Sequence, residues 1–99
     1  MASNPLELHP QAEEEYLTSL DWYVERSPLA AANFQKAFER AIEKIQAAPT
    51  RWPIYFEGCR KYALHQFPFA IVYRVFPSHV MVLAVAHGHR QPGYWRGRL

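Results

Sequence analysis

The stretch His87–Arg96 holds most of the side chains in this chain that could do chemistry. It contains two histidines, two arginines, a tyrosine and a tryptophan, and it directly follows the apolar run Val80–Ala86. Imidazole can transfer protons near neutral pH, and guanidinium groups bind phosphate or carboxylate through paired hydrogen bonds. Polar groups at the end of a rigid core strand are well placed to contact an outside molecule. We therefore expect this tail to be a functional surface.

The side chains of the tail allow more than one role. His87 could close the core edge through a backbone hydrogen bond, contact a macromolecule, or act as an acid or base near a phosphate. His87 and His89 lie on one side of an extended chain, but no further ligand follows at metal-binding spacing, so we expect neither a metal nor a cofactor. Arginines beside aromatic rings, as at Arg90 and Tyr94, are typical of nucleic-acid surfaces and of protein-binding hot spots alike.

Further cations precede the tail. Arg60 and Lys61 open one predicted strand, and Arg74 lies in the middle of the next. Alternation places Arg74 on the sheet face away from the helices. An ion pair with Glu57 or an aromatic cover would offset the cost of a charge in a sheet.

Charge is distributed unevenly along the chain. Residues 1–48 contain eight acidic and four basic side chains, a balance of −4, whereas residues 49–99 contain one acidic and seven basic side chains, a balance of +6. The net charge of +2 conceals this difference. Such asymmetry suggests an acidic partner for the second half.

Composition limits the class of protein. Ninety-nine residues, 49% of them hydrophobic, predict one globular domain over residues 1–99. The lone Cys59 excludes an internal disulfide and fits a reduced, cytoplasmic setting, where we expect it to be inert. Apolar runs are far shorter than a membrane-spanning helix, and Met1–Pro5 lacks the features of a signal peptide.

Periodicity predicts the elements that position these residues. Alternation favours a strand over Leu6–His9, and an apolar stripe predicts a helix from Pro10 to about Arg26. Ser27 and Pro28 start a second helix, which Pro49 stops. A loop over residues 49–58 then precedes three strands, over residues 60–67, 69–76 and 80–87. The predicted fold class is α+β: an N-terminal strand and an antiparallel helical hairpin packed on a C-terminal three-stranded antiparallel sheet. Trp22 departs from the apolar stripe of the first helix, so exposure there would indicate an interface.

The order of elements and the tail resemble a known superfamily. The segments Phe67–Val75 and Val82–Trp95 are similar to those of RelE/ParE toxins of type II toxin–antitoxin systems. The specific part is the last strand with its His-x-x-Arg-x-Pro-x-Tyr-Trp tail, which begins at His87. The helical hairpin, with Trp52 and Pro53 after it, also fits.

This resemblance implies one of two activities on one fold. RelE-like members cleave mRNA in the ribosomal A site, whereas ParE-like members block DNA gyrase without being nucleases. RelE-like toxins carry a basic residue on the third strand, three positions before its tyrosine, and here that position is Ala70. Because alanine cannot stabilise phosphate charge, we favour gyrase inhibition by a non-enzyme and keep the ribosome-dependent endoribonuclease as the alternative. The catalytic candidates for that alternative are His87, Tyr94, Arg74 and Glu57.

The resemblance also implies partners. The target would be gyrase or, in the alternative, the ribosome with mRNA, and a cognate antitoxin would neutralise the toxin in a heterotetramer or larger assembly. We expect no contact with a membrane. The predicted target-binding residues are Arg60, Lys61, His87, His89, Arg90, Tyr94, Trp95 and Arg96.

Overall fold

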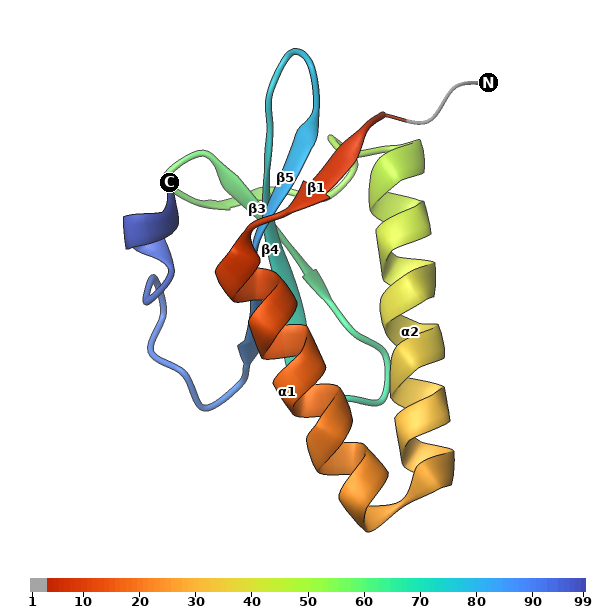
Figure 1. Cartoon of the computed structure of the whole chain (residues 1–99). Helices are drawn as coiled ribbons and strands as arrows, with labels where there is room; N and C mark the ends of the chain where they lie inside the picture. Colours follow the sequence, from red (N-terminus) through yellow and green to blue (C-terminus); the bar gives the residue numbers. More distant parts are fainter. Residues whose placement is uncertain (1–3) are drawn as a thin grey trace.

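Two helices form one layer against a five-stranded sheet in the computed structural model, which describes residues 4–99 (Figure 1). The expectation of no signal peptide therefore rests in part on residues 1–3, which lie outside the described range. The helices are α1 (Pro10–Arg26) and α2 (Pro28–Ala47), and the strands are β1 (Leu6–Leu8), β2 (Ile54–Phe56), β3 (Cys59–Ala63), β4 (Phe69–Val75) and β5 (Val80–His87). A short 3₁₀ helix, η1 (Arg96–Arg98), follows. The predicted α+β class is confirmed.

The sheet is larger than the predicted three strands. Its order is β1-β5-β4-β3-β2, and β1 runs parallel to β5, with Leu6 opposite Val80. The loop expected over residues 49–58 contains β2, which forms a hairpin with β3 through Glu57 and Gly58. Both turn residues have positive φ, +47° and +77°, as a two-residue hairpin turn requires. Strand β3 ends at Ala63, four residues before the predicted end at residue 67.

Capping side chains fix the helical hairpin. His9, predicted to belong to the first strand, instead caps α1, and its Nδ1 accepts a hydrogen bond from the Gln11 N–H at 3.1 Å. Ser27 both ends α1 and starts α2. Its N–H donates to the Tyr23 carbonyl at 2.7 Å, and its Oγ accepts from the Ala30 N–H at 3.1 Å. This single connecting residue forces the predicted antiparallel arrangement.

Apolar side chains gather on both faces of the sheet. The helix-facing cluster contains Phe34, Ile45 and Tyr73, all fully buried. The opposite face carries a smaller cluster of Cys59, Val72, Leu83, Ala84 and Trp95. Cys59 has no exposed surface, and burial raises the pKa of its thiol, so its thiolate is disfavoured.

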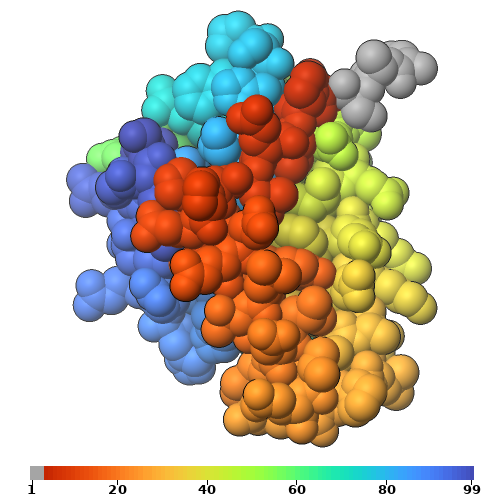
Figure 2. Space-filling view, viewed as in Figure 1, coloured from red at the N-terminus to blue at the C-terminus, as the bar shows by residue number. Residues whose placement is uncertain are grey.

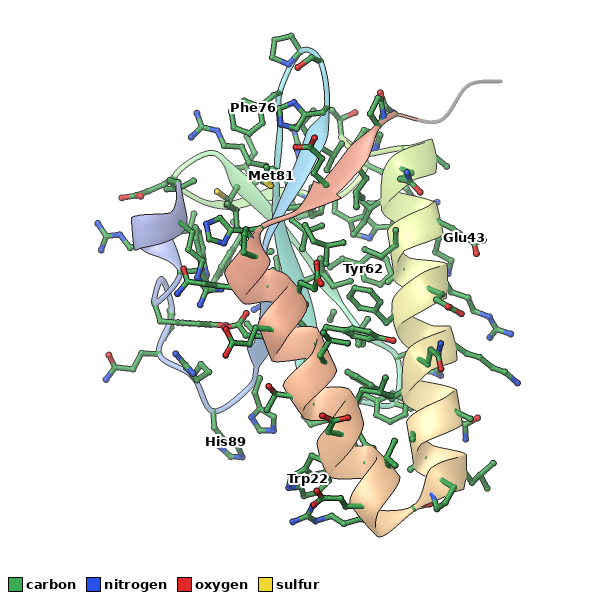
Figure 3. All side chains as sticks on the ribbon, viewed as in Figure 1. Trp22, Glu43, Tyr62, Phe76, Met81 and His89 are labelled. Carbon is green, nitrogen blue, oxygen red and sulfur yellow. The ribbon has the colours of Figure 1, made fainter. Side chains whose placement is uncertain are left out.

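The helical layer carries an exposed aromatic side chain. Figure 2 shows this face, with α1 in front and the C-terminal tail beside the first half of that helix. Trp22 is 52% exposed at the far end of α1, where it is labelled in Figure 3. Within residues 4–99, no helix combines the length and apolarity needed to cross a membrane.

Candidate functional site

The C-terminal tail, defined as residues 88–99, turns back over the sheet after β5. The Gly88 N–H donates to the Pro68 carbonyl at 2.8 Å, which fixes the point where the tail leaves the strand. Gly93 has a φ of +79°, and a β-carbon there would lie 2.9 Å from the Arg96 Cδ. Glycine thus permits the bend that brings the following aromatic pair onto the sheet.

Trp95 anchors the tail and is not exposed. It is 1% exposed within the cluster on the sheet face opposite the helices, and its ring meets Phe56 edge-on, with centroids 6.1 Å apart. Trp95 was predicted to contact a target, but in this arrangement its side chain has almost no exposed surface for such a contact. The physical reason is that the open sheet face needs an apolar cover, and the tryptophan ring supplies it.

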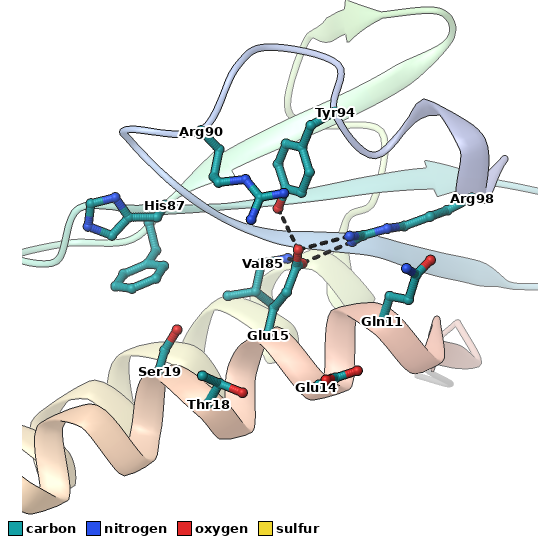
Figure 4. A pocket seen from close by; sticks show the side chains of 11 residues that line it. Gln11, Glu14, Glu15, Thr18, Ser19, Val85, His87, Arg90, Tyr94 and Arg98 are labelled. Atoms are coloured by element: carbon teal, nitrogen blue, oxygen red, sulfur yellow. Dashed lines mark hydrogen bonds and ion pairs between the residues drawn. The ribbon is translucent and has the colours of Figure 1, made fainter.

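A carboxylate on α1 holds the rest of the tail. The Glu15 Oε1 accepts hydrogen bonds from the Val85 N–H at 3.0 Å and from Arg98 Nη1 at 2.9 Å. Its Oε2 accepts from the Tyr94 hydroxyl at 2.8 Å and from Arg98 Nη2 at 2.9 Å (Figure 4). Arg98 Nη1 also donates to the Leu83 carbonyl at 2.9 Å. One carboxylate thus joins α1 to β5 and to two residues in the second half of the tail.

Burial strengthens the electrostatic interactions among Glu15, Tyr94 and Arg98. The Arg98 and Glu15 side chains are 9% and 19% exposed. Burial by itself would raise the pKa of Glu15, but hydrogen bonds from Arg98, Tyr94 and Val85 outweigh it, and the pKa lies below its ordinary value. Burial and the bond to Glu15 together raise the pKa of the Tyr94 hydroxyl. Tyr94 is therefore a poor proton donor at neutral pH.

A hollow opens between α1 and the tail. It has a volume of about 320 Å³ and is lined by residues of α1, β4, β5 and the tail: Gln11, Glu14, Glu15, Thr18, Ser19, Phe69, Val85, His87, Arg90, Tyr94 and Arg98. Figure 4 shows the labelled members of this set. Arg90 lies over the Tyr94 ring, with its Cζ 4.0 Å from the centroid. The hollow therefore combines an exposed cation and an aromatic ring, Arg90 and Tyr94, with the exposed carboxylate of Glu14, while Glu15 and Arg98 pair with each other.

The two histidines stack on each other at its rim. Their ring centroids are 4.8 Å apart, and His87 also meets Phe69 edge-on at 5.0 Å. The His87 Nδ1 accepts a hydrogen bond from the His89 N–H at 3.1 Å, and its Nε2 has no hydrogen-bond partner among the described residues. His87 is half-buried, whereas His89 and Arg90 are exposed.

The predicted cations of β3 have different surroundings. Arg60 is half-buried, and its Nη1 donates to the carbonyls of Thr50 at 3.2 Å and Trp52 at 2.5 Å. Arg60 therefore ties down the connection after α2. Lys61 is exposed, and its Nζ lies 4.6 Å from the centroid of the Tyr55 ring.

The four catalytic candidates do not come together. Glu57 pairs with Arg96 Nη2 at 3.0 Å, and Arg74 lies over the Phe76 ring at 5.2 Å. The aromatic cover proposed for Arg74 is present, whereas an ion pair with Glu57 is absent among the described residues. The Tyr94 hydroxyl donates a hydrogen bond to Glu15. Of the four candidates, His87 and Tyr94 line the hollow beside α1, whereas Glu57 and Arg74 do not.

Two central residues of the site were not predicted. Neither Glu15 nor Arg98 was among the residues predicted to form a site. The sequence contains one related signal, because an acidic first half and a basic second half favour ion pairs between them. Within residues 4–99, no three histidine, cysteine, aspartate or glutamate side chains gather as a metal site.

Comparisons with known proteins identify the family. Residues 6–92 match the family described as "ParE toxin of type II toxin-antitoxin system, parDE". No curated protein sequence matches the chain significantly. Among solved structures, the chromosomal ParDE toxin–antitoxin system from P. aeruginosa superposes with a TM-score of 0.74 at 19% identity, over 86% of this chain and 96% of that one. The likeness in structure concerns the fold, and the family match covers most of the sequence. This chain belongs to the ParE toxin family of type II toxin–antitoxin systems.

Proposed function

We propose that this toxin inhibits DNA gyrase by binding, without catalysing a reaction. The observation that supports this proposal is the dispersal of the four catalytic candidates. RNA cleavage requires a base for the 2′-hydroxyl, an acid for the leaving oxygen and cations at the phosphate, all within hydrogen-bond reach of one another. Here two of the four residues are engaged elsewhere, Glu57 with Arg96 and Arg74 with Phe76.

Two further residues, Ala70 and Tyr94, also favour binding over catalysis. Ala70, which stands where RelE-like toxins carry a cation, is 9% exposed on β4 and offers only a methyl group. Tyr94 is held by Glu15, and its raised pKa makes it a weak acid. A binding surface has no such requirement, because it needs exposed contact groups and no convergent acid and base.

The contact surface that we propose is the exposed part of the tail with its cationic neighbour on β3. It comprises His87, His89, Arg90, Arg96 and Lys61, with the Tyr94 ring beneath Arg90. Trp95 supports this surface from within, whereas Arg60 binds the connection after α2. Charged and aromatic groups of this kind give both steering and specificity at protein interfaces.

Regulation by a cognate antitoxin follows from the family. We propose that an acidic antitoxin segment covers the tail surface, in a heterotetramer or larger assembly in the cytoplasm. The +6 balance of residues 49–99 supports an acidic partner. The internal Glu15–Arg98 pair offsets one of these charges, so the remainder lies on cations such as Arg90.

Expression without antitoxin tests the proposal. We expect growth arrest with intact messages in primer extension, because binding to gyrase leaves mRNA uncut. Cuts at fixed codon positions would contradict the proposal and support the endoribonuclease.

A matched set of variants locates the surface. His87→Ala with Arg90→Ala should abolish the arrest while preserving the fold, whereas Arg51→Ala, which also removes an exposed guanidinium, should leave it intact. Arrest that survives the double substitution would show that the contact surface lies elsewhere.

A further inference from the structure

A second cationic surface lies on α2, on the opposite side of the molecule from the tail (Figure 1). Lys36, Arg40 and Lys44 follow one another at intervals of four residues, so they form a row along one flank of the helix. All three are exposed, and none forms an ion pair with a described residue. We call these three residues the α2 row.

The α2 row borders a hollow of about 420 Å³ between α2 and the β3–β4 connection. Its lining consists of Asn33, Lys36, Ala37, Arg40, Lys44, Tyr62, His65, Gln66 and Phe67. No carboxylate is part of this lining. Glu39 and Glu43 belong to the same helix and neighbour the row, each three residues after one of its cations, but neither lines the hollow, and Glu43 points away from α1 (Figure 3).

Aromatic rings accompany the cations in this hollow. Tyr62 and Phe67 are half-buried and present part of their rings to it. Tyr62 lies between α2 and the sheet, as Figure 3 shows, and meets Trp52 at 4.9 Å. A row of cations along a groove with aromatic rings beside it is the arrangement by which proteins bind single-stranded nucleic acid.

We propose that the α2 row is a binding site for the phosphodiester backbone of a nucleic acid strand. Residues four apart on a helix are about 6 Å apart along its axis, which is comparable with the separation of successive phosphates in an extended strand. Three cations in this row can therefore each meet one phosphate. The amide groups of Asn33 and Gln66 add donors at the ends of the hollow. An acidic protein segment would also meet the cations, but phosphates at regular spacing beside bases that stack on aromatic rings match the row and the rings together.

This site is separate from the tail and does not depend on gyrase being the target. For a toxin that acts on a protein–DNA complex, backbone contacts would hold it near DNA without reading sequence. Binding through phosphates alone predicts no base preference and a strong dependence on salt.

Fluorescence anisotropy with a labelled mixed-sequence single-stranded DNA tests the proposal on the full chain. Each lost phosphate contact lowers the slope of log K against log salt by about 0.7, which corresponds to about a fivefold loss of affinity at 0.1 M salt. Arg40→Gln should show this loss, whereas Arg26→Gln, a matched change in α1, should not. Lys36→Gln with Lys44→Gln should lose about 25-fold, and thermal melts verify that the fold is retained.

Three results would overturn the proposal. The first is wild-type binding no tighter than that of the Lys36→Gln, Lys44→Gln variant. The second is an equal loss for Arg26→Gln and Arg40→Gln, which would reflect overall charge. The third is tighter binding of a polyglutamate peptide than of DNA, when substitutions in the α2 row weaken that peptide binding. This result would assign the surface to an acidic protein.

Discussion

Replacing Glu15 by alanine should loosen the whole C-terminal tail. The substitution removes the acceptor of four hydrogen bonds, from the Val85 N–H, the Tyr94 hydroxyl and both Nη atoms of Arg98. It also leaves the Arg98 guanidinium, 9% exposed, with the Leu83 carbonyl as its one remaining hydrogen-bond acceptor among the described residues. The effect should therefore exceed that of a surface ion pair.

The size of the expected loss in the free energy of unfolding follows from the burial of the Glu15–Arg98 pair. Breaking a fully buried pair costs about 3–5 kcal/mol, and an exposed pair contributes about 0–1 kcal/mol. Because Glu15 retains 19% exposure and water can reach part of the cluster, we expect a loss of about 3 kcal/mol in the free energy of unfolding. At roughly 4–8 °C for each kcal/mol in a domain of this size, Tm should fall by about 12–24 °C.

Urea denaturation followed by tryptophan fluorescence measures this loss, since Trp95 leaves its apolar site on unfolding. Glu14→Ala is the control, because Glu14 is exposed on the same helix and forms no ion pair with a described residue. A double-mutant cycle of Glu15→Ala with Arg98→Met should return a coupling energy of about 1.5–3 kcal/mol. A loss below about 0.5 kcal/mol for Glu15→Ala would refute the reasoning, since that is the level of an ordinary surface change.

Three further outcomes follow from the same contacts. The folded-state pKa of Glu15 lies below its ordinary value of 4.5, so its contribution to the free energy of unfolding is complete above that pH and decreases as the pH falls below it. The stabilities of the wild type and of Glu15→Gln, measured by acid titration, should therefore converge at low pH. Trp95→Ala should cost about 3–5 kcal/mol in thermal unfolding, whereas Trp22→Ala at its exposed position should cost about 0.5 kcal/mol, and similar losses for the two would contradict the burial of the tail. Gly93→Ala should cost about 1–2 kcal/mol by the same measurement, because its φ of +79° disfavours a β-carbon, and a neutral effect would indicate a different bend.

The helices and the central hairpin could be predicted because their signals are local. Pro10 and Ser27 mark the helix starts, and the apolar runs of β4 and β5 leave no alternative to buried strands. Strand β2 was missed because Pro53 indicated a loop, although Ile54–Phe56 followed by Glu57 and Gly58 carries the signal of a two-residue hairpin.

The site was harder to predict than the fold. Exposure of Trp95 could not be judged from the tail alone, since it depends on the uncovered sheet face that β3, β4 and β5 create together. The Glu15–Arg98 pair joins residues 83 positions apart, and three consecutive glutamates offered no basis for choosing one. Long-range pairing of charges is a property of the folded arrangement and leaves no periodic trace in the sequence.

We propose that this ParE family toxin stops gyrase by contact through its tail. Supercoiling of relaxed plasmid by purified gyrase, with toxin titrated in, measures this most directly. We expect the wild-type toxin to inhibit supercoiling, the His87→Ala, Arg90→Ala variant to fail, and Arg51→Ala to inhibit as the wild type does. Full supercoiling in the presence of excess folded wild-type toxin would contradict the claim.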